Sequence, residues 1–173
     1  PPPLPFRSRR AGSAASGIVV KPLLVTAFFD IGRGDWQAPA LKRSSETYVE
    51  RYRRYGAQLD APRFLVCDRK TADAVGGTAD YLHVADLVDM PAARHLRRTT
   101  EVMAHPAFRR LFRPKEDLRH CEHIFPAYNI AMLAKYDALR MAARQTNHSY
   151  SHYIWIDFGA THRGDGASVP LPQ

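Results

Sequence analysis

The sequence has few of the features that mark several common classes of protein. Its 173 residues contain only two cysteines, Cys67 and Cys121, and no Cys-x-x-Cys pair. This excludes a disulfide framework and a paired-cysteine zinc site, and favours an intracellular, reducing compartment. The longest apolar stretch, from Ile18 to Ile31, is interrupted by charged residues and a proline, so no transmembrane segment is expected. The N-terminus shows no secretory signal.

Several catalytic fingerprints are also missing. The chain contains no Gly-x-Gly-x-x-Gly, no Walker sequence and no Gly-x-Ser-x-Gly. These absences argue against the usual dinucleotide-binding and P-loop motifs and against a serine nucleophile elbow. Cys67 follows a short apolar run, which is typical of a small buried residue rather than a reactive thiol.

Basic charge is abundant. The formal net charge is +8 and the sequence pI is about 9.8. A basic surface favours acidic partners such as RNA, phosphate-rich ligands, anionic lipid or acidic protein subunits. The arginines are spread along the chain, so a solvated basic face without a particular partner is the alternative interpretation.

Composition divides the chain into three parts. Residues 1–17 are rich in Pro, Arg, Ser, Ala and Gly, which predicts an extended basic arm, and residues 164–173 predict a similar tail. Residues 18–163 form the predicted domain. Because such tails bury no core of their own, we expect both to lie against other protein subunits. The arm lacks acidic residues and contains arginine, a composition typical of organelle transit regions, which suggests a mitochondrial protein.

Apolar runs and helical spacings alternate between the two tails. Three short apolar runs predict strands at residues 23–29, 63–67 and 81–84, and a further run predicts a strand at 150–157. Helices are predicted over 46–59, around 71–75, as two short arginine-rich segments between 87 and 112, and over 127–144. The expected core face of the last helix consists of Tyr128, Met132, Tyr136, Leu139 and Ala143.

This alternation predicts an α/β fold with a mostly parallel, open sheet and helices on both faces. Ligands of such sheets bind outside the carboxyl ends of the strands. That rule selects three places, which are Asp30 to Arg33, Asp68 to Arg69 and Asp157 to His162.

Two of these places carry residue types suited to a phosphate ligand. Asp30 and Arg33 stand in a glycine-punctuated loop after the first strand, where arginine can bind phosphate through two parallel hydrogen bonds. Asp157 stands at the end of the last predicted strand, near a glycine, a position suited to holding a divalent cation between two phosphates. The alternative interpretation of the first place is an Asp–Arg pair at a strand end, and that of the second is a strand-end aspartate that caps the next turn.

Two other groups of residues carry weaker signals. His120, Cys121, Glu122 and His123 are zinc-ligand types without a second half at ligand spacing, which favours a polar loop before Pro126. The arginine-rich helices could face RNA, although no RNA-module signature accompanies them. Their arginines are Arg94, Arg97, Arg98, Arg109, Arg110 and Arg113.

Five parts of the chain carry a common resemblance, namely Val25 to Arg33, Tyr48, Pro126 to Asn129, Lys135 and Trp155 to Gly159. Together they resemble the HtrL/YibB family, whose members look like glycosyltransferases of the GT-A fold. The resemblance covers roughly residues 22–163, and its two end motifs are the most specific part.

The resemblance implies a nucleotide-sugar site in what corresponds to the N-terminal half of that fold. It implies nucleotide binding by Thr26, Asp30, Arg33 and Lys135, and it places Asp157 where the fold carries a metal-binding Asp-x-Asp, with Mg²⁺ or Mn²⁺ as the cation. The position two residues after Asp157 is Gly159 and not an acid.

Three functions follow as expectations. The first is a non-catalytic accessory subunit of a large, plausibly mitochondrial assembly, derived from a glycosyltransferase-like domain and needing no cofactor. The second is a glycosyltransferase that depends on a nucleotide sugar and a divalent cation. The third is an RNA-binding subunit, recognised by a steep salt dependence of affinity.

Overall fold

A computed structural model describes residues 22–36, 41–56, 59–111 and 120–159. The predicted arm, residues 1–17, and the predicted tail, residues 164–173, lie outside these residues.

The described residues form a four-stranded, all-parallel sheet in the order β3-β2-β1-β4. This confirms the α/β fold expected from the sequence. β1 and β2 match the predicted strands closely, whereas β4 is much shorter than the predicted run. The strands are β1 Leu23–Phe28, β2 Arg63–Cys67, β3 Tyr81–Val84 and β4 Tyr153–Trp155.

The central strands are buried on both faces. Residues Leu23 to Thr26 of β1 and Phe64 to Cys67 of β2 are each at most 1% exposed. Because helices cover both faces, these strands are nearly continuous apolar runs instead of alternating patterns, and Thr26 is the one polar residue within the run of β1.

One face of the sheet is covered by α1 Ser45–Arg51 and α2 Arg69–Val75. Ser44 caps α1, because its hydroxyl accepts a hydrogen bond from the Thr47 amide, and Asp68 caps α2 in the same way. The first helix continues as a π-helical segment, η3 Tyr52–Gly56, and its predicted extension to residue 59 is therefore too long.

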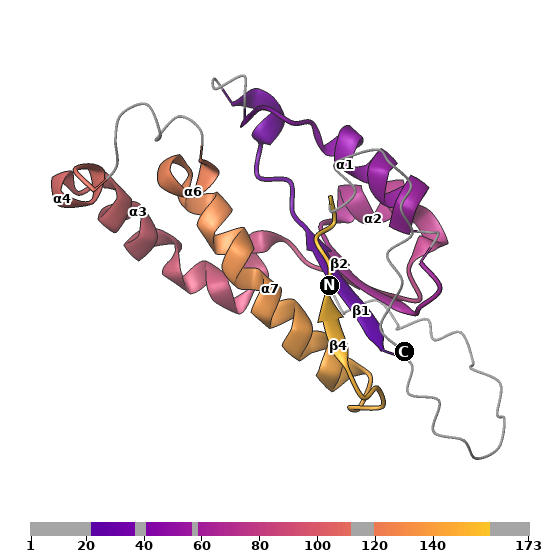
Figure 1. The fold of residues 1–173 in the computed structure, drawn as a ribbon. Coiled ribbons are helices and arrows are strands. Elements are labelled where there is room, and N and C mark those ends of the chain that lie inside the picture. The colour runs from indigo at the N-terminus through magenta and orange to yellow at the C-terminus, as the bar shows by residue number, and fades with distance from the viewer. Residues whose placement is uncertain (1–21, 37–40, 57–58, 112–119, 160–173) are drawn as a thin grey trace, which may run out of the picture.

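The opposite face is covered by α7 Pro126–Gln145 and by η6 Pro91–His95. Figure 1 shows α7 on one side of the sheet and α1 and α2 on the other, which confirms the prediction of helices on both faces. The prolines at positions 91 and 106 each begin a helix. The polar loop expected before Pro126 contains a short helix, α6. The remaining helices are η1 Arg33–Asp35, η4 Gly76–Thr78, η5 Leu87–Asp89, α3 Leu96–Ala104, α4 Pro106–Arg109 and α6 Cys121–Ile124.

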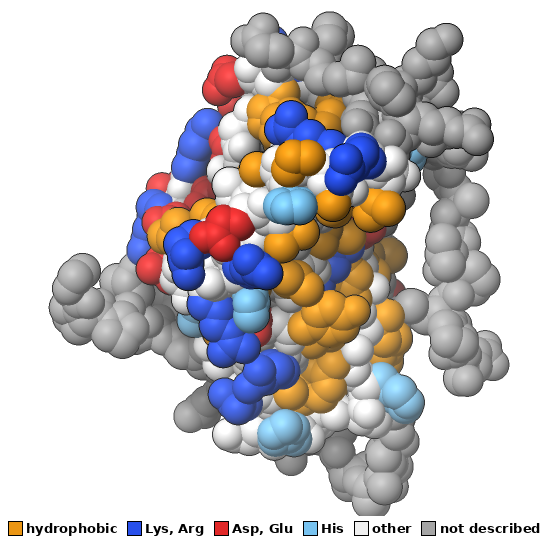
Figure 2. All heavy atoms as spheres, turned by 90° about the vertical axis from the view of Figure 1, so that its left-hand side faces the viewer, with side chains coloured by type: hydrophobic (Ala, Val, Ile, Leu, Met, Phe, Trp, Pro, Cys, Tyr) orange, Lys and Arg blue, Asp and Glu red, His pale blue; other side chains and the backbone are white. Residues whose placement is uncertain are grey.

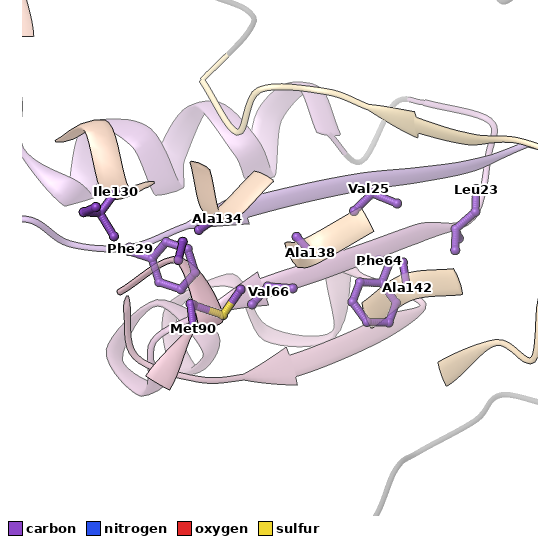
Figure 3. Packing of buried hydrophobic residues seen from close by; sticks show 11 residues of the cluster. Leu23, Val25, Phe29, Phe64, Val66, Met90, Ile130, Ala134, Ala138 and Ala142 are labelled. Atoms are coloured by element: carbon purple, nitrogen blue, oxygen red, sulfur yellow. The ribbon is translucent and has the colours of Figure 1, made fainter. Parts of the chain in front are cut away.

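The predicted core face of α7 is wrong except at Leu139, which is partly buried against the core. The buried residues are Ile130, Ala134, Ala138 and Ala142, each at most 1% exposed, whereas Tyr136 is 68% exposed. In Figure 3 these four side chains point toward the apolar side chains of β1 and β2. Three alanines at a spacing of four residues let the helix approach the sheet closely, and the larger side chains on the neighbouring stripe face elsewhere.

Lengthening a side chain on the alanine face tests this packing. Ala138→Leu is expected to lower the free energy of unfolding by about 1–3 kcal/mol, because added methylenes push α7 away from the sheet. Tyr136→Ala should lower it by less than about 0.5 kcal/mol, although this change removes a whole phenol ring, because the ring is exposed. Urea titrations followed by circular dichroism measure both changes, and a larger loss for Tyr136→Ala would contradict the observed helix orientation.

Candidate functional site

A pocket lies where the chain changes direction within the sheet. From β1 the chain passes to β2 on one side, and it returns much later to β4 on the other side. The carboxyl ends of β1 and β4, which are neighbours in the sheet, lie at this change of direction, and open parallel sheets bind ligands at such a place. The pocket there has a volume of about 630 Å³. It is lined by the end of β1 and its loop, the start of α1, one stripe of α7 and the residues that follow β4.

Asp30 organises the loop that follows β1. Its carboxylate accepts hydrogen bonds from the Gly32 amide at 3.0 Å and from the Ser45 hydroxyl at 2.5 Å. Its own amide donates to the Asp68 carboxylate at 3.0 Å. Gly32 has a φ of +72°, a left-handed conformation that glycine adopts without strain. Asp30 therefore fastens the loop to the start of α1 and to the cap of α2.

Arg33 is held in a fixed orientation at the pocket wall. Its guanidinium donates to the Leu41 carbonyl through Nε at 3.3 Å and through Nη2 at 2.9 Å, and to the Tyr48 hydroxyl through Nη1 at 2.7 Å. The guanidinium also lies within 6 Å of the ring centroids of Trp36, Tyr48 and Tyr128. A guanidinium carries more N–H donors than these three bonds use, so Arg33 retains donors for an anion.

Lys135 and Asp157 form an ion pair on the other side of the pocket. The Lys135 ammonium donates to Asp157 Oδ1 at 2.8 Å and lies 5.3 Å from the centroid of the Trp155 ring. The indole N–H of Trp155 donates to the same carboxylate oxygen at 2.9 Å. Partial burial raises the pKa of Asp157, but the hydrogen bonds from Lys135 and Trp155 and the lysine charge outweigh it, so the pKa lies below its usual value.

The structure brings four of the five predicted site residues to one pocket. Asp30, Arg33, Lys135 and Asp157 all line it. Thr26 does not, because it lies within β1 and is 1% exposed. Its hydroxyl has no hydrogen-bond partner among the described residues.

The residues missed by the sequence analysis include Tyr128 and Met132 of α7. They line the pocket together with Lys135. Tyr128 and Met132 are four residues apart and Met132 and Lys135 are three apart, so all three lie on one stripe of the helix. The helical spacing of Tyr128 and Met132 predicts a core face in the sequence analysis, whereas the structure places both residues at the pocket. The lysine at the end of the stripe was the signal that it faces a polar site.

Glycine is required at position 159 by close contact. An added Cβ there would lie 2.7 Å and 2.8 Å from two carbon atoms of the Tyr48 ring. The neighbouring Phe158 ring stacks on Phe28 and Tyr52, with centroids 4.7 Å and 4.4 Å away. The segment after β4 is thereby fixed against β1 and α1, which places Asp157 at the pocket.

The donor set around Asp157 does not fit a divalent cation held by the protein. No group of three or more His, Cys, Asp or Glu side chains able to hold a metal occurs in the described part of the chain. Oδ1 of Asp157 already accepts hydrogen bonds from Lys135 and Trp155. Among the zinc-type residues around position 120, His120 lies 3.7 Å from the Glu122 carboxylate and its ring centroid lies 5.1 Å from that of His123.

Neither cysteine has the surroundings of a nucleophile. Cys67 and Cys121 are both buried. Burial raises the pKa of the Cys67 thiol to about 12 and also raises the pKa of Cys121. The expectation that Cys67 is a buried apolar residue is confirmed.

The arginine-rich segments lie on the surface. Arg97 and Arg98 of α3 both pair with Glu101, and Arg94, Arg109 and Arg110 are exposed, while Arg113 lies outside the described residues. Within the residues that the structure describes, no helix is long and apolar enough to cross a membrane.

The structure is therefore that of an α/β domain with a pocket at the carboxyl ends of its parallel strands. The family model described as "Bacterial protein of unknown function (HtrL_YibB)" matches residues 21–168, and the chain therefore belongs to the HtrL_YibB family. No curated protein and no solved structure matches the chain.

A double-mutant cycle tests the contact between Gly159 and the Tyr48 ring. Gly159→Ala is expected to lower the free energy of unfolding by about 1–3 kcal/mol, because the new methyl group collides with the ring. In a Tyr48→Ala background the same change should cost little, since the ring is gone. Free energies from urea titrations complete the cycle, and simple additivity of the two changes would contradict the contact.

Proposed function

We propose that this domain binds a nucleotide sugar and serves as the donor site of a glycosyltransferase. The observation that carries the proposal is the meeting of Arg33 and Lys135 at one pocket. They come from the loop after β1 and from α7, more than a hundred residues apart in the sequence. Two cations at the carboxyl ends of parallel strands form a suitable site for a diphosphate.

The rest of the pocket suits the other parts of such a ligand. Tyr48, Tyr128 and Trp155 contribute aromatic surface to the lining, and aromatic side chains can stack on a nucleobase or pack against a sugar ring. Asp30, Glu122 and Asp157 add carboxylates, which accept hydrogen bonds from sugar hydroxyls. The volume of about 630 Å³ lies within the range typical of small-molecule sites.

Thermal unfolding with nucleotides tests the proposal. Uridine or guanosine diphosphate, and their sugar conjugates, should raise the midpoint temperature. A ligand at about one hundred times its Kd stabilises the folded state by about 2.7 kcal/mol. Ala131→Trp places a large ring in the pocket and should abolish the shift.

Leu133→Trp, which adds the same ring at an exposed position of α7, is the matched control and should respond as the wild type does. The proposal is wrong if no nucleotide shifts the midpoint, or if Ala131→Trp responds as strongly as the control.

A second candidate function is that of an accessory subunit, and one surface observation favours it. Leu133 and Tyr136 of α7 and Val102 of α3 are large apolar side chains with at least 40% of their surface exposed, and the two helices pack together. Figure 2 shows hydrophobic side chains gathered on this side of the molecule, with Lys and Arg side chains beside them. Such a surface suits contact with another protein.

Site-specific photo-crosslinking tests that role. A photoreactive amino acid at the position of Tyr136 should yield defined protein adducts in cells, because this side chain would lie in the contact. The same amino acid at the position of exposed Asp73, on α2 at the opposite side of the sheet, is the control. Identical adducts from both positions, or none from position 136, would contradict the accessory role.

A further inference from the structure

The place that the family resemblance assigns to a metal ion is taken by a lysine. We propose that the ammonium of Lys135, held by Asp157 and Trp155, replaces the divalent cation, so that the pocket binds a diphosphate without metal. This inference rests on the proposed nucleotide-sugar site and specifies how that site neutralises phosphate charge.

One carboxylate oxygen of Asp157 already has two hydrogen-bond donors. Asp157 Oδ1 accepts hydrogen bonds from Lys135 at 2.8 Å and from Trp155 at 2.9 Å. A metal ion binding at this oxygen would have to displace both donors and would meet the lysine charge at short range. The Lys135 side chain is only 22% exposed and lies beside the Trp155 ring, so it has little room to withdraw.

The position two residues after Asp157 offers no second carboxylate ligand. Mg²⁺ takes hard oxygen ligands, and sites of this kind use one or two protein carboxylates together with the substrate phosphates. The position that would supply the second carboxylate is Gly159, where even a Cβ would lie 2.7 Å from the Tyr48 ring. That ring is itself fixed by the hydrogen bond from Arg33 to the Tyr48 hydroxyl. An acidic side chain at position 159 would therefore require the Tyr48 ring to move.

Two cations of the pocket lining have fixed orientations. Arg33 and Lys135 reach the pocket from different elements, and both line it. Both side chains are oriented before a ligand binds. Arg33 donates hydrogen bonds to Leu41 and Tyr48, and Lys135 donates one to Asp157. Cations fixed before the ligand arrives lose little conformational freedom on binding and provide the attraction that a metal ion would otherwise supply. Asp157 then acts as a positioning residue for Lys135.

Isothermal titration calorimetry with inorganic pyrophosphate, uridine diphosphate and guanosine diphosphate tests the inference. Each probe is titrated once with excess EDTA and once with MnCl₂. Affinity should be equal or higher in EDTA, because Mn²⁺ in solution neutralises the diphosphate that the two side chains attract. Lys135→Met should weaken binding in EDTA at least about tenfold.

Arg140→Met is the matched control, since it removes one positive charge from an exposed position of the same helix and should leave affinity unchanged. A second measurement on the wild type follows Mn²⁺ alone by electron paramagnetic resonance. No bound Mn²⁺ is expected, and this measurement decides the question if Lys135→Met fails to fold.

The outcomes separate the inference from the proposed function. Binding that needs Mn²⁺, or Mn²⁺ bound by the protein alone and lost in Asp157→Asn, overturns the inference and leaves the nucleotide site intact. Metal-free binding of pyrophosphate without binding of either nucleotide supports the inference and overturns the proposed function. Absence of binding by all three probes overturns both.

Discussion

Close packing of α7 against the sheet determines how the rest of the molecule is arranged. Ile130 and three alanines occupy the face that touches β1 and β2, and small side chains there allow the helix axis to approach the strands. Once this face is fixed, the neighbouring stripe of Tyr128, Met132 and Lys135 is directed at the ends of the strands. The packing of the core thereby places the lysine ammonium beside Asp157.

A second set of contacts ties the two halves of the pocket together. Arg33, in the loop after β1, donates to the hydroxyl of Tyr48 on α1, and the Tyr48 ring lies against Gly159 after β4. These three residues come from distant parts of the chain, and each constrains the next. A loop that carried Arg33 without this support would lose the fixed direction of its guanidinium, and the pocket would lose its preorganised cation.

The chemistry of the pocket follows from these two constraints. Parallel strands bring their carboxyl ends to one edge, the order β3-β2-β1-β4 opens a crevice between β1 and β4, and basic side chains converge there from both sides. The family description gives no function, so the proposal of a nucleotide-sugar site depends on this charge and aromatic content. The ion pair of Lys135 and Asp157 gives the site a feature that a metal-dependent version of the fold would not need.

The sequence by itself determined the order of strands and helices, the parallel sheet and the positions of Asp30, Arg33 and Asp157 at strand ends. Continuous apolar runs such as Leu23 to Phe28 and Arg63 to Cys67 are local signals, so they could be recognised without a structure. Only the tertiary structure decided which stripe of α7 is buried, because this helix carries apolar side chains on more than one face. Because the helix lies close to the sheet, the small alanine side chains form its buried face. The adjacent stripe of the helix then places Lys135 beside Asp157.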